Sequence, residues 1–128
     1  MRTEREIEAL RVIEKLKEGW EKLDRDLILS VFHDDAVMHS MMKDPYNGKA
    51  EIALMLDGFL AVATSVRMEL LSQCVDGDIV VLERRDHFTV QGKSGVLPAV
   101  GVFEIENGLI RTWREYFDWA FYERQLED

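Results

Sequence analysis

Two charged residues interrupt an apolar segment in the second half of the chain, at a spacing that suits paired chemistry. Arg84 and Asp86 lie within a predicted strand, Val80 to Val90, whose residues alternate between two faces. They share a face with the apolar residues Val80, Leu82, Phe88 and Val90. Either charge would be costly to bury alone. The pair is therefore a candidate ion pair or part of a catalytic site.

A third charged residue, Glu115, shows the same anomaly in the last predicted strand. Its parity is shared by the large apolar residues Leu109, Trp113, Phe117 and Trp119. If both strand faces line one pocket, the planar guanidinium of Arg84 can bridge the two acids. The ionised cluster has one excess negative charge, and apolar walls favour a proton on one acid. One carboxyl would then donate a proton and the other accept one, as general acid–base catalysis requires.

Structural explanations stand beside this catalytic one. A β-bulge that reverses parity, a barrel rim, a structural ion pair or a dimer interface could each place charged residues on an apparent core face. Glu115, as a third member, favours a site over these alternatives.

Other reactive residue types lack visible partners. The single cysteine, Cys74, excludes an internal disulfide, and the three histidines show no metal-ligand spacing. We therefore expect chemistry that needs no metal. Ser40 has no G-x-S-x-G context and is interpreted as a hydrogen-bonding group. The methionines are interpreted as packing residues, several of which could give a pocket adaptable walls: Met38, Met41, Met42, Met55 and Met68.

The first half of the chain predicts the helices that must cover these strands. Thr3 and Glu6 form a capping-box pattern, after which apolar residues recur every three or four positions: Ile7, Leu10, Ile13, Leu16, Trp20 and Leu23. Asp24 can cap a short second helix that runs to about Phe32. A strand over 36–41, a loop over 44–48 and a third helix over 49–61 follow.

Everything beyond Thr64 is predicted to be strand. Three turn signals divide it: Asp76-Gly77, Gln91 to Gly95 and Asn107-Gly108. They predict a four-stranded meander, in which Pro98 is tolerable at an edge or a bulge. The fold class is therefore α+β, with N-terminal helices packed in a curved, mostly antiparallel sheet that encloses a pocket.

Composition limits the partners. The chain has 128 residues, which suits one domain over 1–128, with 16 Lys and Arg against 25 Asp and Glu and a net charge of -9. This charge would repel nucleic acid and anionic lipid. No window predicts a membrane span, and the charged N-terminus does not resemble a secretory signal, so a cytoplasmic protein is expected.

Two segments resemble a known family. The residues GVFEIENGLIRTWREYFD, from Gly101 to Asp118, and LERRDHF, from Leu82 to Phe88, resemble the limonene-1,2-epoxide hydrolase family. That family is a branch of the cone-shaped, nuclear transport factor 2-like and SnoaL-like folds. The WR-acid-YFD pattern is also shared with SnoaL-type polyketide cyclases, so the resemblance is more specific for the fold than for the reaction.

The resemblance implies site residues. The family opens an epoxide with water in one step, using an Asp-Arg-Asp triad and no cofactor. Arg84 and Asp86 match its Arg-x-Asp portion, and Glu115 stands where the family has Asp. The family's water-holding Tyr and Asn fall at Met38 and Ser40. Ser40 could still bind a water, whereas Met38 cannot replace a phenol.

Three hypotheses follow. The first is an epoxide hydrolase in which Glu115 is the base, Asp86 the acid, Arg84 the bridge and Ser40 a water holder. Its small hydrophobic substrate would contact Met38, Leu82, Phe88, Trp113, Phe117 and Trp20. The second is an isomerase or cyclase acting beside a carbonyl, and the third is a non-catalytic ligand-binding dimer. By the same resemblance, we expect a homodimer formed through the outer face of the sheet.

Overall fold

The computed structural model describes the whole chain, residues 1–128, and begins with two capped helices. Helix α1 spans Glu4–Lys22, and the predicted capping box is present: the Glu6 amide donates to the Thr3 hydroxyl, and the Thr3 amide donates to the Glu6 carboxylate. Helix α2 spans Arg25–Ser30 and is capped by Asp24, which accepts from the Leu27 amide. Both helix predictions are confirmed.

The first strands and the third helix follow. Strand β1 spans Phe32–Met41 and so begins four residues before the predicted strand. A short strand, β2 (Tyr46–Asn47), lies within the predicted loop and pairs with β1. Helix α3, Lys49–Leu60, is confirmed. None of the helices is both long enough and apolar enough to cross a lipid bilayer.

The predicted meander is confirmed. It consists of β3 (Ala63–Asp76), β4 (Ile79–Val90), β5 (Lys93–Glu106) and β6 (Leu109–Tyr116). Two consecutive residues adopt positive φ in the β5–β6 turn, Asn107 at 51° and Gly108 at 74°, which is the geometry expected for an Asn-Gly hairpin turn.

One part of the prediction is wrong: the chain beyond Thr64 is not all strand. It ends in a short helix, α4, at Trp119–Gln125, capped by the Asp118 carboxylate. Gln125 fixes this helix to the sheet, because its side-chain amide both accepts from and donates to the backbone of Val96, at 2.9 and 3.0 Å. The helix is thereby held against β5.

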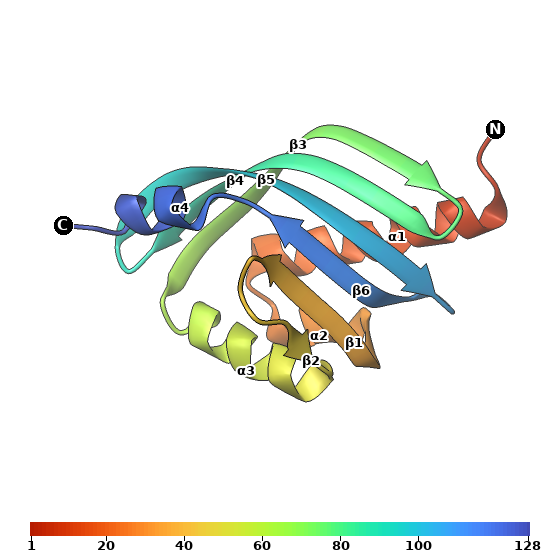
Figure 1. The fold of residues 1–128 in the computed structure, drawn as a ribbon, viewed down its shortest axis with the longest axis horizontal. Helices are drawn as coiled ribbons and strands as arrows, with labels where there is room; N and C mark the ends of the chain where they lie inside the picture. Colours follow the sequence, from red (N-terminus) through yellow and green to blue (C-terminus); the bar gives the residue numbers. More distant parts are fainter.

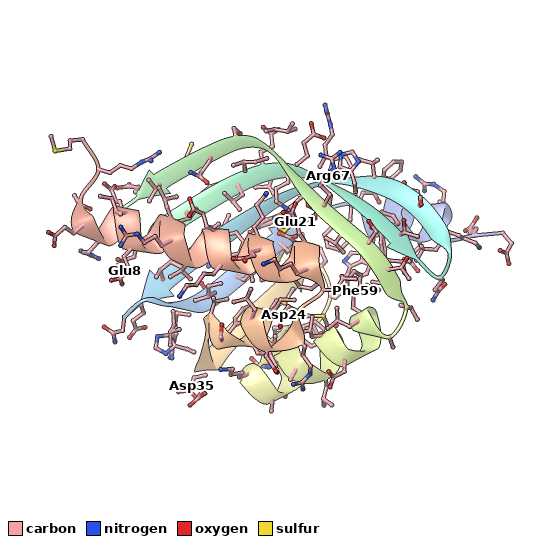
Figure 2. The ribbon with its side chains drawn as sticks, turned by 180° about the vertical axis from the view of Figure 1, so that it is seen from behind. Glu8, Glu21, Asp24, Asp35, Phe59 and Arg67 are labelled. Carbon is pink, nitrogen blue, oxygen red and sulfur yellow. The ribbon has the colours of Figure 1, made fainter.

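The six strands form one curved sheet in the order β2-β1-β6-β5-β4-β3, in which only β1 and β6 run parallel. Helix α1 lies across the concave face (Figures 1 and 2), and its buried side chains form the main core with residues of β1, β4, β5 and β6. Register shifts in β3 accompany the curvature. Pro98 lies on β5 before its pairing with β6 begins at Val100, so it occupies an edge position as expected.

Candidate active site

A cavity of about 180 Å³ opens beside the main core, and twelve of its sixteen lining residues are hydrophobic. Its walls come from α1, α3, α4, β1 and the inner face of the meander. Nine of the predicted site residues line it: Trp20, Met38, Ser40, Arg84, Asp86, Phe88, Trp113, Glu115 and Phe117. The sequence thus located most of this pocket.

Leu82 does not line the cavity. It is 3 % exposed and belongs to the main core with the buried face of α1. The alternation that placed it on the inner face is correct, because Val80, Leu82, Arg84, Phe88 and Val90 are all buried. The inner face of β4 is longer than the pocket, however, and its first half packs under the helix.

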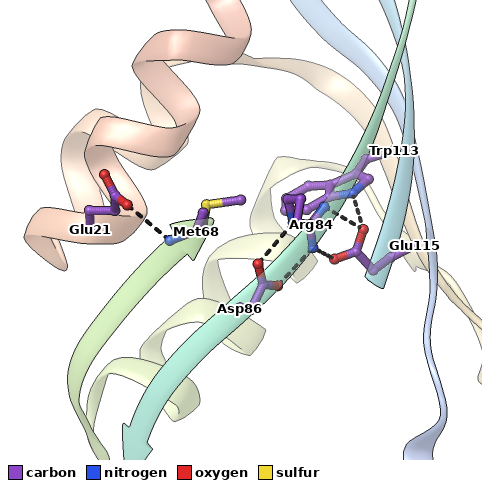
Figure 3. Close-up of polar contacts among 6 residues, drawn as sticks. All are labelled: Glu21, Met68, Arg84, Asp86, Trp113 and Glu115. Carbon is purple, nitrogen blue, oxygen red and sulfur yellow. Dashed lines mark hydrogen bonds and ion pairs between the residues drawn. The ribbon is translucent and has the colours of Figure 1, made fainter. Parts of the chain in front are cut away.

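Arg84 joins the two acids as predicted (Figure 3). Its Nε and Nη2 donate to the two carboxylate oxygens of Asp86, at 2.9 and 2.8 Å. Its Nη1 donates to Oε1 of Glu115 at 3.1 Å, and Nη2 also contacts Oε2 of Glu115. The planar fork of a guanidinium permits this double bridge, which the point charge of a lysine could not form.

The strand ladders explain why these distant residues meet. Arg84 and Asp86 project from the same face of β4, and Glu115 projects inward from β6. Strand β5 lies between them, and its Gly101 pairs with Leu82 on one side and Glu115 on the other. The side chain of Arg84 therefore reaches across a residue that has no side chain.

The two acids have different surroundings. The Glu115 side chain is 9 % exposed, whereas the Asp86 side chain is 22 % exposed. Burial raises the pKa of Glu115 above its usual range, against the opposing attraction of Arg84. The indole Nε1 of Trp113 also donates to Oε1 of Glu115, at 3.0 Å. Glu115 is thus a basic carboxyl held in one orientation.

Arg84 stays charged despite being 2 % exposed. Burial alone would lower its pKa, but hydrogen bonds and charges from Asp86 and Glu115 outweigh burial and raise it. The guanidinium can therefore polarise and orient both acids without itself exchanging protons.

Strand β1 places two further residues beside this cluster. In the parallel ladder Met38 lies opposite Trp113, and Ser40 lies opposite Glu115. Ser40 is 8 % exposed and its hydroxyl forms no hydrogen bond to another protein group. A hydroxyl that lines the pocket next to Glu115 can hold a water or a polar substrate atom.

Sequence reasoning missed part of the pocket wall. Trp119 and Tyr122 come from α4, which was taken for strand. An Asp at position 118 followed by aromatic residues three apart was the available signal for a capped helix. Phe59, Val66 and Leu97 were also missed, whereas Met55 and Met68 line the cavity and are among the methionines of which several were expected to give a pocket adaptable walls.

The remaining candidates lie elsewhere. The ring nitrogens of His33 and His39 bond to the backbone carbonyls of Glu106 and Lys43, each at 2.7 Å. Cys74 is exposed. No group of three or more His, Cys, Asp and Glu side chains forms a metal-binding arrangement. The Arg84 cluster is therefore the part of the molecule whose geometry suits proton transfer.

Fold and site together define a class: small α+β chains with a curved sheet around an apolar pocket. The chain matches the model of the SnoaL-like domain over residues 13–113 and belongs to that family. Its α+β fold is the nuclear transport factor 2-like fold. A nuclear transport factor 2-like protein of unknown function from Burkholderia pseudomallei is 18% identical, with a TM-score of 0.85 over 94% of this chain and 98% of that one.

Two other solved structures carry names of enzymes. An LEH-like epoxide hydrolase from M. tuberculosis is 25% identical, with a TM-score of 0.82 over 94% of this chain and 90% of that chain. A protein assigned as a polyketide cyclase from Xanthomonas campestris pv. campestris is 17% identical, with a TM-score of 0.86 over 96% and 99%. The second likeness concerns the fold alone.

Proposed function

We propose that this chain is a cofactor-independent epoxide hydrolase that adds water to a small hydrophobic epoxide. The observation that carries the proposal is the buried arginine that bridges two carboxyls at the wall of an apolar pocket. The similarity to the LEH-like epoxide hydrolase from M. tuberculosis supports it. The pocket would hold the hydrocarbon part of the substrate, and the charged cluster would act on the epoxide ring.

In this proposal Glu115 is the general base. It takes a proton from a water that the Ser40 hydroxyl helps to hold, and the water oxygen bonds to one epoxide carbon. Asp86 is the general acid and gives its proton to the epoxide oxygen as the carbon–oxygen bond breaks. The product is a diol, and a proton passes from Glu115 back to Asp86 before the next turnover. The raised pKa of Glu115 makes it a stronger base than a solvated glutamate.

The active cluster carries one proton on its two acids. Arg84 neutralises one negative charge, and the apolar walls disfavour a second. The rate should therefore follow a bell-shaped pH profile, with activity lost when the pair is fully protonated or fully ionised.

The direct test is diol formation from a panel of small alkyl and cycloalkyl epoxides. Asp86→Asn should lower kcat/KM by about 10²-fold or more, since it removes a general acid. Glu69→Gln is the matched control, because Glu69 pairs with His87 in a half-buried ion pair and neither residue lines the cavity. Equal, background-level rates for wild type and Asp86→Asn on every epoxide would contradict the proposal.

A pair of substrates tests which of the two acids donates the proton and which accepts one. A trifluoromethyl epoxide opens to a less basic oxygen than a methyl epoxide, so it needs less help from an acid. The loss caused by Asp86→Asn should shrink on the trifluoromethyl substrate, while the loss caused by Glu115→Gln should not. The opposite pattern would exchange the two roles and leave the hydrolase proposal in place.

A second candidate function is an isomerase or cyclase acting beside a carbonyl. The observation that favours it is the apolar side chain of Met38. It lines the pocket next to Ser40, on the same face of β1. An apolar side chain at this position suits a reaction that consumes no water. Deuterium incorporation from D₂O into a bound ketone, without diol formation from epoxides, would favour this function.

A further inference from the structure

Gly101 occupies a position in the sheet where a glycine is unfavourable. It lies inside β5, is buried, and pairs with strands on both sides. Glycine weakens a strand interior because it loses more conformational entropy and packs no side chain. Such a residue often marks a close approach of other groups to the backbone.

The close approach here is the contact between Arg84 and Glu115. A methyl group built on the Cα of Gly101 would lie 2.8 Å from Oε1 of Glu115 and 2.9 Å from Nη1 of Arg84. These are the two atoms joined by the 3.1 Å hydrogen bond between the side chains. A third contact, with Cε1 of Phe103 at 2.9 Å, closes the remaining side.

We propose that Gly101 is a positioning residue: its missing side chain leaves the space in which Arg84 and Glu115 join. An alanine at this position would push the two side-chain ends apart. Arg84 would keep Asp86, to which Nε and Nη2 donate, and Nη2 is also the atom that contacts Oε2 of Glu115. Glu115 would lose its hydrogen bond from Nη1, so its carboxyl would lie farther from the guanidinium and move relative to the pocket.

The length of the side chain at position 115 determines whether the space above Gly101 is needed. Glutamate is one methylene longer than aspartate, so its carboxyl extends over Gly101 to meet the guanidinium. An aspartate at this position would hold its carboxyl farther back. The sheet therefore offers a compensating pair: a side chain added at position 101 can be balanced by a side chain shortened at position 115.

The role in catalysis rests on the proposed function, but the positioning itself can be tested without turnover. Carbon-13 NMR of the labelled glutamate carboxyls should show the Glu115 titration moved to higher pH in Gly101→Ala, because its cationic partner is farther away. Gly58→Ala is the control for glycine replacement, since a Cβ there would meet no atom within 4 Å. An unchanged Glu115 titration in Gly101→Ala would overturn the proposal.

The activity readout adds a rescue. Gly101→Ala should lower kcat by about 10²-fold with KM unchanged, as expected for a catalytic group misplaced by about 1 Å. The acidic limb of the pH profile, on which Glu115 loses its proton, should move to higher pH in parallel with the NMR titration. Adding Glu115→Asp to Gly101→Ala should recover most of the lost kcat, although Glu115→Asp alone lowers it. A double variant no better than Gly101→Ala would overturn the inference.

Two further outcomes are decisive. If Gly101→Ala does not fold, the double variant with Glu115→Asp should fold, because it relieves the added contact; failure of both would overturn the proposal. If wild type converts no epoxide while the carboxyl titration moves as described, the hydrolase function fails and the positioning role of Gly101 stands.

Discussion

The inner face of β4 passes through two regions that differ in what covers them. Val80 and Leu82 lie under α1 in the main core, whereas Arg84, Asp86 and Phe88 face the pocket. The strand, its face and its alternation are the same in both regions. The change comes where α1 reaches its last turn, at Trp20, which itself lines the pocket.

Past the last turn of α1, the inner face of β4 is covered by mainly aromatic side chains that surround the cavity. Phe88 and Leu97 belong to a small separate cluster of four buried residues, against which Phe59, Phe117 and Tyr122 pack. Close packing in the main core maximises stability, while looser aromatic walls leave room for a ligand. Arg84, Asp86 and Glu115 lie at the border between the main core and the pocket. Burial there is sufficient to shift the pKa of Glu115, while the three side chains still line the cavity.

The largest expected effect comes from removing the guanidinium at this border. Arg84→Met leaves two carboxyls facing each other without a cation, so it should cost about 3–5 kcal/mol of unfolding free energy near neutral pH. The cost should shrink at acidic pH, where the acids become protonated. Urea unfolding followed by circular dichroism at both pH values measures it.

Arg114→Met is the matched control on β6. Arg114 pairs with Glu104 at the surface, with 34 % and 43 % of the two side chains exposed, so its loss should cost at most about 1 kcal/mol. Similar costs for the two variants would mean that the border cluster is as well solvated as the surface pair.

A pair of leucine truncations compares the two covers directly. Leu16→Ala removes a fully buried side chain from the main core and should cost about 3 kcal/mol, with KM unchanged. Leu97→Ala only widens an existing cavity, so it should cost about 2 kcal/mol and raise KM for the epoxide. Chemical denaturation and steady-state kinetics on the same preparations separate the two outcomes. A larger stability loss for Leu97→Ala would show that the pocket wall is part of the core.

Much of the fold could be predicted because its signals are local. The Thr3–Glu6 capping box and the Asn107-Gly108 turn each depend on a few adjacent residues. The alternation along β4 likewise identified the face of Arg84 and Asp86. These features need no knowledge of which strands pair.

The parts that failed depend on pairing or on very short elements. Leu109 was expected on the buried face, but Ile110 is buried instead, because β6 has a register shift against β5 beside Arg111. The seven-residue α4 is too short for periodicity to outweigh its aromatic, strand-like composition. The space above Gly101 cannot be read from sequence, since it exists only when three strands are in register.

The smallest expected effect is a difference in pH dependence between a border acid and a surface acid. Because the folded-state pKa of Glu115 is raised, the folded chain binds this proton more tightly than the unfolded chain does. Its contribution to stability is present at low pH and declines as pH rises above the ordinary value near 4.5. Relative to wild type, Glu115→Gln should therefore gain stability as pH rises through this range.

Glu104 should behave in the opposite way. Its pKa is lowered by Arg114 and Thr112, so its contribution is present above the unfolded-state pKa and is lost as pH falls. Relative to wild type, Glu104→Gln should lose stability as pH rises. Unfolding free energies of both variants, measured from pH 3 to pH 8, should thus diverge with opposite signs. If the two curves of unfolding free energy against pH ran parallel, the buried site of Glu115 and the surface site of Glu104 would have the same effect on the pKa of a carboxyl. The proposed difference between the two regions would then be wrong.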